Sequence, residues 1–442
     1  MDLRDFIVTP FMIMGVYALA YYLRPRLCDE VNYRYFFPAL TVKIVGALAL
    51  GFIYTFYYEG GDTFNYHTYG SRVIWNTFFD DPYAAMRMIL DSSVVPELYK
   101  YTAHIRFYTD PSSMMIVRVA AIFDIITFSS YCGTAVLFAF VSFLGLWFFF
   151  LTFYDLFPHL QRRVAICTLF IPSVVFWGSG ILKDTIVIAA LGILTFFVKK
   201  TFIDKRPTAT SVFFILFCVF LIYSIKKYIL LCFLPAVLLW IYMDNLRRIR
   251  SQMIRVLIAP LVIAITVVSG YYSVIKIGED DPRYAIDKIA QTARVTAYDI
   301  AFQTGRDAGS TYVLGELDDS FQGMIALFPQ AVNVALFRPY LWEVGNPLML
   351  LSALEALVLF MITVLLVIRN PLGWIRSLSN PTVLFCLVFS ITFAFAVGVS
   401  TFNFGTLTRY KIPLLPFYTL ALVLIADNSK NPRKLEEFEA TE

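Results

Sequence analysis

Long apolar stretches recur along this chain and constrain its fold more than any other feature. Those long enough to cross a bilayer as helices cover residues 7–23, 36–58, 133–154, 164–180, 181–198, 208–225, 228–243, 255–276, 347–367, 381–400 and 412–426. Hydrophobic residues make up 59% of the 442, and the mean hydropathy is +0.69, more than one water-soluble core could bury. The sequence therefore predicts an all-α, polytopic bundle of about eleven transmembrane helices.

The apolar run 164–198 is too long for a single crossing. Its centre holds Gly-Ser-Gly at 178–180, followed closely by Lys183 and Asp184. One continuous helix would place both charges in hydrocarbon, whereas a turn would bring them out of it. We therefore expect two helices joined as a hairpin.

Basic residues mark alternate loops between the predicted helices. They are Arg24, Arg26 and Arg34; Arg162 and Arg163; Lys199, Lys200, Lys205 and Arg206; Arg247, Arg248, Arg250 and Arg255; Arg369 and Arg376; and Lys430, Arg433 and Lys434. The positive-inside rule assigns these loops to the cytoplasm, with the N-terminus outside and the C-terminus inside. Residues 116–131 contain Arg118 and Asp124 and would reverse the pattern if they crossed, so we expect a helix that lies at the outer interface or re-enters.

Two long segments lie on the external side in this topology, at residues 59–115 and 278–346. Both contain amphipathic stretches, such as 81–90 and 284–302, which predict short helices packed on the membrane surface. We treat residues 1–442 as a single integral membrane domain that carries these two external loops.

Charge and cysteine usage exclude some classes of function. The formal net charge of +4, spread over loops, is too small for a nucleic-acid surface. The six cysteines form no CxxC pair, and the three histidines are isolated, so the sequence predicts neither a zinc site nor a disulfide framework. No cofactor is indicated, although a carboxylate at the membrane surface could hold a divalent metal.

The first external segment opens with Glu-Gly-Gly-Asp at 59–62. The two glycines permit a sharp turn, and Asp62 could accept a proton from an acceptor hydroxyl or bind a divalent ion. The alternative is that Asp62 caps the next helix. Farther along, Asp80-Asp81-Pro82 could supply a second carboxylate, but helix capping is the favoured interpretation of that motif.

Basic residues in short external hairpins are informative because membrane insertion disfavours them there. The candidates are Lys183, Lys226, Lys227, Arg409 and Lys411. Together with Asp184 beside Lys183, they suggest a site for a lipid-linked phosphate, in which Arg offers a bidentate fork and Lys a point charge. Alternatively, each cation reaches lipid phosphates or pairs with a neighbour such as Asp184.

The second external segment ends in an aromatic and charged sequence before the helix at 347–367. Arg338, Trp342 and Glu343 could hydrogen-bond to a sugar ring and stack on it. A membrane-interface belt with an internal Arg–Glu pair explains the same residues without a ligand.

These features resemble the GT-C glycosyltransferase superfamily, which includes protein mannosyltransferases and lipid A aminoarabinose transferases. The resemblance rests on the external acid after a helix, the multi-helix bundle and the Arg-Tyr-Lys-x-Pro-Leu-Leu-Pro-Phe sequence at 409–417. It implies a polyprenyl-phosphate-linked sugar donor, with Asp62 as the catalytic base and Arg409 near the donor phosphate. Here the acid follows the second predicted helix, whereas it commonly follows the first in that superfamily, and the usual paired acids of the second external loop are replaced by Lys183-Asp184.

The strings Phe-Trp-Gly-Ser-Gly-Ile-Leu-Lys-Asp at 176–184 and Arg-Pro-Tyr-Leu-Trp-Glu at 338–343 are also similar to segments of bacterial membrane proteins from polysaccharide assembly. The leading hypothesis is a transferase that moves a sugar to a glycan, lipid or protein acceptor outside the bacterial cytoplasmic membrane. The alternatives are an O-antigen-type polymerase relying on Arg306 and Arg338, and a non-enzymatic lipid-glycan transporter. Apart from Lys43 and Glu355, few charges lie well within a span, which argues against the transporter.

Overall fold

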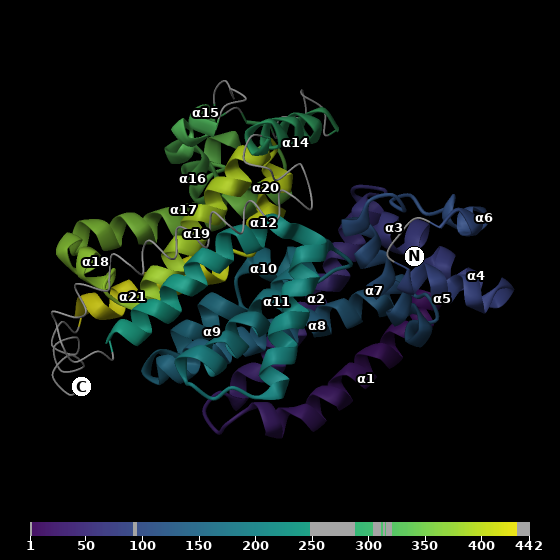
Figure 1. The fold of residues 1–442 in the computed structure, drawn as a ribbon, viewed down its shortest axis with the longest axis horizontal. Coiled ribbons are helices and arrows are strands. Elements are labelled where there is room, and N and C mark those ends of the chain that lie inside the picture. The colour runs from purple at the N-terminus through teal and green to yellow at the C-terminus, as the bar shows by residue number, and fades with distance from the viewer. Residues whose placement is uncertain are drawn as a thin grey trace. The chain divides into compact units, whose positions relative to one another are not determined.

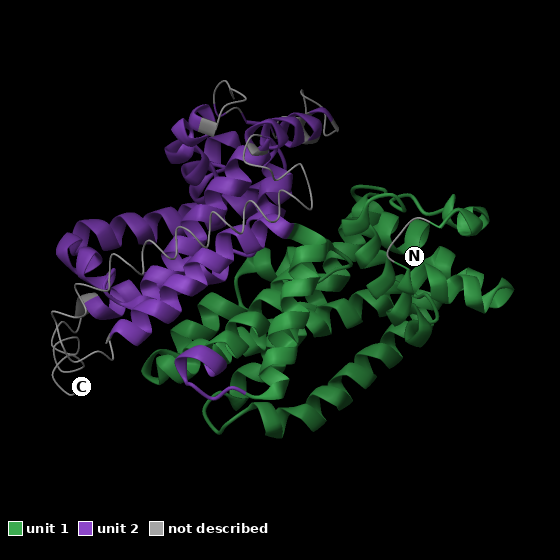
Figure 2. Cartoon of the chain, in the orientation of Figure 1, with its two compact units in different colours: residues 1–199, 208–226 green, residues 200–207, 227–442 purple. Residues whose placement is uncertain are grey.

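The computed structural model describes residues 2–91, 95–247, 288–303, 311–312, 314 and 321–430. They form two compact units (Figures 1 and 2). Unit 1 comprises Met1–Lys199 and Thr208–Lys226, and unit 2 comprises Lys200–Pro207 and Lys227–Glu442. The described residues are helical, apart from turns, loops and one isolated bridge between Thr311 and Asn403, so the predicted all-α class is confirmed.

The helices of unit 1 are α1 (Leu3–Leu27), α2 (Tyr33–Phe56), α3 (Asp62–Tyr66), η1 (His67–Ser71), α4 (Arg72–Asp80), α5 (Pro82–Leu90), η2 (Pro96–Leu98), α6 (Tyr99–Thr102), α7 (Pro111–Thr127), α8 (Tyr131–Leu156), η3 (Pro158–Leu160), α9 (Gln161–Leu169), α10 (Pro172–Trp177) and α11 (Lys183–Val198). η4 (Lys199–Ile203) follows α11, and α12 (Ala209–Arg247) contributes to both units. Unit 2 also contains α14 (Ile289–Gln303), α15 (Phe321–Ala326), α16 (Phe328–Phe337), η6 (Leu341–Glu343), α17 (Pro347–Arg369), α18 (Pro371–Ser377), α19 (Pro381–Ser400), α20 (Phe404–Tyr410) and α21 (Leu415–Lys430).

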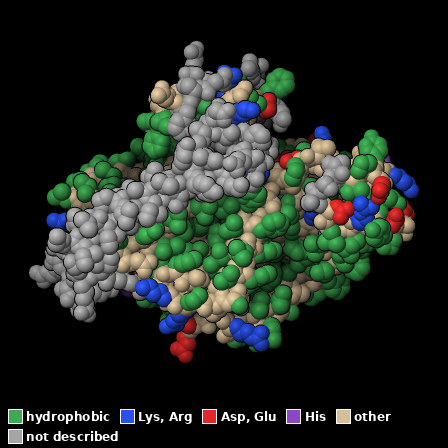
Figure 3. Space-filling model, viewed as in Figure 1, with side chains coloured by type: hydrophobic (Ala, Val, Ile, Leu, Met, Phe, Trp, Pro, Cys, Tyr) green, Lys and Arg blue, Asp and Glu red, His purple; other side chains and the backbone are tan. Residues whose placement is uncertain are grey.

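Seven helices of the described residues are long and apolar enough to cross a membrane, and an eighth if α20 and α21 are counted as one span bent by 68°. The seven are α1, α2, α8, α11 with η4, α12, α17 and α19. Apolar side chains cover most of the visible described surface, with many Lys and Arg side chains near its margins (Figure 3). The chain is therefore an integral membrane protein with several helical spans. The predicted span 255–276 lies outside the described residues.

One predicted crossing is interrupted in the structure. Residues 164–180 form α9 and α10, of 9 and 6 residues, too short to cross about 30 Å of hydrocarbon singly. The break precedes Pro172, because Ile171 is extended and proline disfavours helical backbone at the residue before it. The predicted turn at 178–180 is confirmed, since the chain is non-helical between α10 and α11.

The predicted spans 208–225 and 228–243 are two helical stretches that follow one another without an intervening loop and meet at a break. Both belong to α12, whose backbone leaves helical geometry at Lys226, with φ −145° and ψ 79°. A straight helix of 39 residues would rise about 59 Å, nearly twice the hydrocarbon thickness. The break at Lys226 is near the middle of that length.

Small residues permit the close packing of α8 on α11 in unit 1. A Cβ added to Gly145 would lie 2.3 Å from the Cα of Ala189, and one added to Gly192 would lie 2.2 Å from the carbonyl oxygen of Gly145. Side chains therefore cannot be accommodated there, and the two backbones approach closely, as they do at many membrane helix interfaces.

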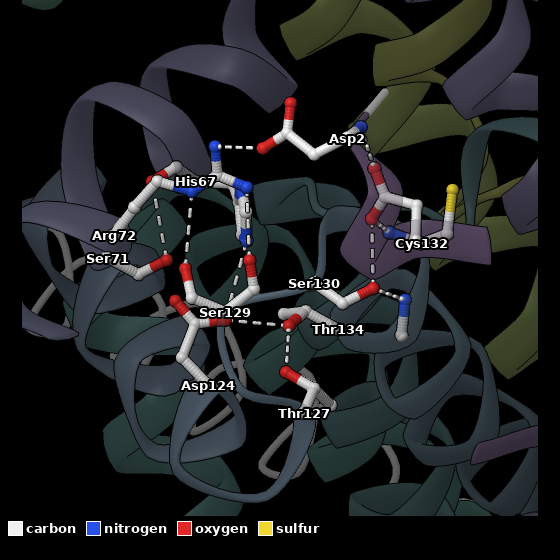
Figure 4. Close-up of polar contacts among 12 residues, drawn as sticks. Asp2, His67, Ser71, Arg72, Asp124, Thr127, Ser129, Ser130, Cys132 and Thr134 are labelled. Carbon is white, nitrogen blue, oxygen red and sulfur yellow. Dashed lines mark hydrogen bonds and ion pairs between the residues drawn. The ribbon is translucent and has the colours of Figure 1, made fainter. Parts of the chain in front are cut away.

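Polar contacts mark the two ends of the unit 1 helices. At one end, Arg34 donates to Gln161 (2.9 Å), and Lys199 pairs with Asp155 (3.2 Å), which joins three of the predicted cytoplasmic regions. At the other end, Asp5 accepts a hydrogen bond from Ser130 (2.9 Å; Figure 4). We call these the basic end and the opposite end of unit 1.

Candidate functional site

A sharp turn presents Asp62 at the opposite end of unit 1, just after α2. Glu59, Gly60 and Gly61 all have positive φ, at 51°, 145° and 116°. The two glycines are suited to this backbone, and a Cβ on Gly61 would lie 2.8 Å from the ring of Tyr54. Gly61 occupies the N-cap position of α3 and Asp62 its first turn, so the interpretation of Asp62 as an N-cap is wrong.

The second candidate acid of this segment, Asp81, has the structural role that was favoured for it. Its carboxylate accepts a hydrogen bond from the Ala84 amide (3.0 Å) at the N-terminus of α5, with Pro82 in the first turn. Helix capping accounts for this residue, and the favoured interpretation is confirmed.

Lys183 contacts an acid that the sequence analysis missed. Its ammonium lies 3.1 Å from Asp110 and donates to the Ser112 hydroxyl at 2.6 Å. Asp110 caps α7, accepting hydrogen bonds from the amides of Ser112 and Ser113. Burial alone would raise the pKa of Asp110, but Lys183 and the hydrogen bonds from the two serines and Lys183 lower it to about 2. The Asp110-Pro-Ser-Ser pattern is itself a helix-start signal.

Asp184 points to a different partner from its neighbour in the sequence. It forms a buried ion pair with Lys226, at the break in α12. The alternative that a cation of these hairpins pairs with Asp184 is confirmed for Lys226, and the ion pairs of Lys183 and Asp184 link α11 to α7 and to α12. Buried charges require such partners, because each would otherwise lose its hydration without compensation.

Lys43 holds the turn that precedes Lys183 and Asp184 against α2. This fully buried side chain of α2 donates to the carbonyls of Val174 (2.9 Å) and Gly178 (2.8 Å), at the C-terminus of α10. Ser142 of α8 also donates to the Gly178 carbonyl, at 2.6 Å. Because Lys43 lies near the middle of α2, the turn after α10 is recessed well within the length of that helix.

Arg338 and Glu343 form a bidentate ion pair in unit 2. The guanidinium Nε lies 3.1 and 3.0 Å from the two carboxylate oxygens, and Nη2 also contacts the carboxylate. The hydrogen bond to Glu343 raises the pKa of Arg338. Burial would raise the pKa of Glu343, but hydrogen bonds from Arg338 and the Tyr340 amide lower it. The predicted internal pair is confirmed, and aromatic rings of Tyr312 and Phe404 lie 5.6 and 5.3 Å from the guanidinium.

The two basic candidates of the 409–417 sequence lie at α20 and just after it. Lys411 is buried and donates to the carbonyl of Arg338 at 3.4 Å. Arg409 is also buried, with its guanidinium 5.8 Å from the ring centre of Tyr410. Asn403 caps α20 by accepting from the Thr406 amide, which fixes the start of this helix.

The predicted site residues thus divide between the units. Unit 1 contains Asp62, Lys183 and Asp184, whereas unit 2 contains Arg338, Glu343, Arg409 and Lys411. Among the described residues, no group of three or more His, Cys, Asp or Glu side chains is placed to hold a metal ion. No protein-family model, curated protein or solved structure matches this chain.

Proposed function

We propose that this chain is a membrane glycosyltransferase that moves a sugar from a polyprenyl-phosphate-linked donor to a glycan, lipid or protein acceptor. The observation that carries the proposal is a pair of features in unit 1. Asp62 directly follows a turn of positive-φ residues, and the ammonium group of Lys183 follows the recessed turn after α10. Both lie toward the end opposite the basic loops. A lipid-linked donor needs such an arrangement, because its phosphate remains near the membrane while the acceptor approaches from water.

The proposed chemistry is a single inverting displacement. Asp62 takes the proton of the acceptor hydroxyl, whose oxygen forms a bond to the anomeric carbon of the donor sugar. The bond from that carbon to the phosphate oxygen breaks, and the phosphate leaves with the electron pair. Lys183 stabilises the negative charge that develops on the phosphate.

Sugar transfer by the purified full-length protein, with polyprenyl-phosphate sugars as donors, tests this proposal. Asp62→Asn removes the base with little change in size, and Lys183→Gln removes the phosphate-binding charge. Asp80→Asn and Lys100→Gln are matched controls, because both residues are exposed in the same external segment. We expect activity to fall at least about a hundredfold in Asp62→Asn. Full activity in Asp62→Asn would reject the catalytic-base proposal.

The proposal includes a GT-C-like bundle of about eleven crossings in the bacterial cytoplasmic membrane, with the N-terminus outside. Single exposed cysteines at the two ends of unit 1, labelled from one side of right-side-out vesicles, test this orientation. Labelling of the 59–115 segment from outside is expected. Labelling of the 157–163 loop from outside would reverse the topology.

Polymerisation of lipid-linked glycans is a related candidate, favoured by the bidentate arrangement of Arg338 with an acid and aromatic rings. Arg306, its second expected arginine, lies outside the described residues. Loss of chain extension in Arg338→Lys, with full activity in Asp62→Asn, would favour the polymerase.

A lipid-glycan transporter is favoured by a different observation, the buried Lys43 at the interrupted span of α9 and α10. Translocation of a labelled lipid-linked glycan in vesicles, undiminished in Asp62→Asn, would support this alternative.

A further inference from the structure

Trp342 in unit 2 is a large aromatic side chain that the fold leaves exposed. It belongs to η6, between α16 and α17, and 82% of its surface is accessible. The other five tryptophans are buried or half-buried, namely Trp75, Trp147, Trp177, Trp240 and Trp374. Burial of an indole removes much apolar area from water and stabilises a fold. Exposure of this one indole therefore favours a contact with a ligand.

The indole ring is held in one orientation by the phenol ring of Tyr340. The ring centres are 4.8 Å apart and the ring planes are inclined by 27°, which is a stacked arrangement. The Tyr340 hydroxyl in turn accepts a hydrogen bond from the side-chain amide of Asn333 on α16, at 3.0 Å. One face of the indole is thus covered by Tyr340, and the exposed area of Trp342 lies on the rest of the ring.

Hydrogen bonds close the loop that carries these two rings. The Glu343 carboxylate accepts from the Tyr340 amide at 2.8 Å, and the Glu343 amide donates to the Tyr340 carbonyl at 3.0 Å. The same carboxylate forms the bidentate ion pair with Arg338, whose carbonyl accepts from Lys411. The loop is therefore fixed at both of its ends. A surface that is already ordered loses less entropy when it binds a ligand.

Polar groups flank the exposed ring. The side chains of Arg338 and Glu343 are 19% and 18% exposed. Glu343 binds the Nε and Nη2 edge of the guanidinium, so the Nη1 edge is directed elsewhere with its own N–H donors. The indole N–H of Trp342 is a further donor. We call Arg338, Tyr340, Trp342 and Glu343 the aromatic platform.

A sugar ring matches this combination of groups. The C–H groups on one face of a pyranose form an apolar surface that stacks on an aromatic ring, while the hydroxyls at its rim bond to planar polar side chains. A membrane interface also attracts tryptophan. It requires neither a fixed ring orientation nor an ion pair beside the ring, and the aromatic platform has both. The geometry therefore favours a carbohydrate.

We propose that the aromatic platform is a glycan-binding site, in which a pyranose ring stacks on the open face of Trp342 and its hydroxyls accept hydrogen bonds from Arg338. The glycan is neutral, because the Arg338–Glu343 pair carries no net charge. In the topology proposed above, the platform faces outside, since the far end of α17 carries Arg369. Binding at this site does not depend on the proposed transferase activity.

Titration of the purified full-length protein with neutral oligosaccharides tests the site. The probes are oligomers of glucose, galactose, mannose and N-acetylglucosamine, the detergent has no sugar headgroup, and saturation-transfer NMR measures binding. The wild type should bind at least one oligomer. Trp342→Ala should weaken that binding at least about tenfold, as removal of an aromatic anchor typically does. Trp342→Phe, which keeps an aromatic ring, should weaken it less.

Phe302→Ala is the matched control, because Phe302 is 78% exposed on α14 in the same unit. It should bind as the wild type does. Asp62→Asn should also bind normally, so that loss of glycan binding and loss of sugar transfer are separate results. Absence of binding by every oligomer, or equal binding by Trp342→Ala and the wild type, would overturn the proposal.

Insertion of Trp342 into the bilayer is the competing outcome. The fluorescence difference between the wild type and Trp342→Phe isolates the emission of this indole in vesicles. Lipids brominated on their acyl chains should quench it only weakly if the ring binds glycans in water. Strong quenching that a saturating oligosaccharide leaves unchanged would place the ring in the membrane and would also overturn the proposal.

Discussion

Units 1 and 2 both bury charged side chains, but the partners in unit 1 are far apart in the sequence. Lys183 pairs with Asp110 and Asp184 with Lys226, which are 73 and 42 residues away. In unit 2, the clearest pair is Arg338 with Glu343, only five residues away. The first pairs connect separate helices, whereas the second stabilises one local turn. Loss of a pair should therefore cost more in unit 1 than in unit 2.

The largest effect is expected from Lys226→Met. This change leaves the Asp184 carboxylate buried without its ion-pair partner, which typically destabilises a protein by about 3–5 kcal/mol. The double variant with Asp184→Asn should recover much of that loss, because it removes the buried charge. Denaturant unfolding in mixed micelles measures both values. Equal stability of the single variant and the wild type would contradict the account of this pair.

A smaller effect is expected from Lys43→Met. The Val174 carbonyl would retain the Gly178 amide as a donor, and the Gly178 carbonyl would retain the Ser142 hydroxyl. Loss of the two hydrogen bonds from Lys43, with neither carbonyl left unsatisfied, costs about 1–3 kcal/mol. The same unfolding measurement applies, with Lys100→Met as an exposed control. A cost as small as that of the control would show that this amine does not stabilise the turn.

Asp110→Asn should change how the free energy of unfolding falls at acidic pH. The pKa of Asp110 is lowered from 3.8 to about 2, so its stabilisation is present above about pH 4 and is lost as the pH falls toward 2. Because Asp110 is partly exposed, we expect only about 1 kcal/mol at pH 7. Acid unfolding followed by tryptophan fluorescence compares variant and wild type. A difference in the free energy of unfolding between variant and wild type that stays constant down to pH 2 would be inconsistent with a charged Asp110–Lys183 contact.

Hydrophobicity was enough to predict the helical class, several spans and the turn between α10 and α11. Local motifs were enough to predict the cap at Asp81 and the pair of Arg338 with Glu343. The contacts of Lys43 and Asp110 were missed because each partner lies on another helix, and helix packing is not readable from local spacing. The break in α12 falls at the predicted turn, because two lysines in an apolar run mark such a break.

The smallest stability effect is expected from Glu343→Gln in unit 2. The glutamine carbonyl can still accept from Arg338 and from the Tyr340 amide, so the loss should be about 0.5 kcal/mol. A loss as large as that in Lys226→Met would erase the contrast between the units.

Sugar transfer by Asp62→Asn, beside the wild type and Asp80→Asn, tests the central claim most directly. Asp62 lies in the first turn of α3, so the melting temperature of the variant is measured beside its activity to show that it folds. The proposed role as base predicts at least about a hundredfold lower kcat in Asp62→Asn and normal activity in Asp80→Asn. Wild-type kcat in a folded Asp62→Asn protein would contradict the account.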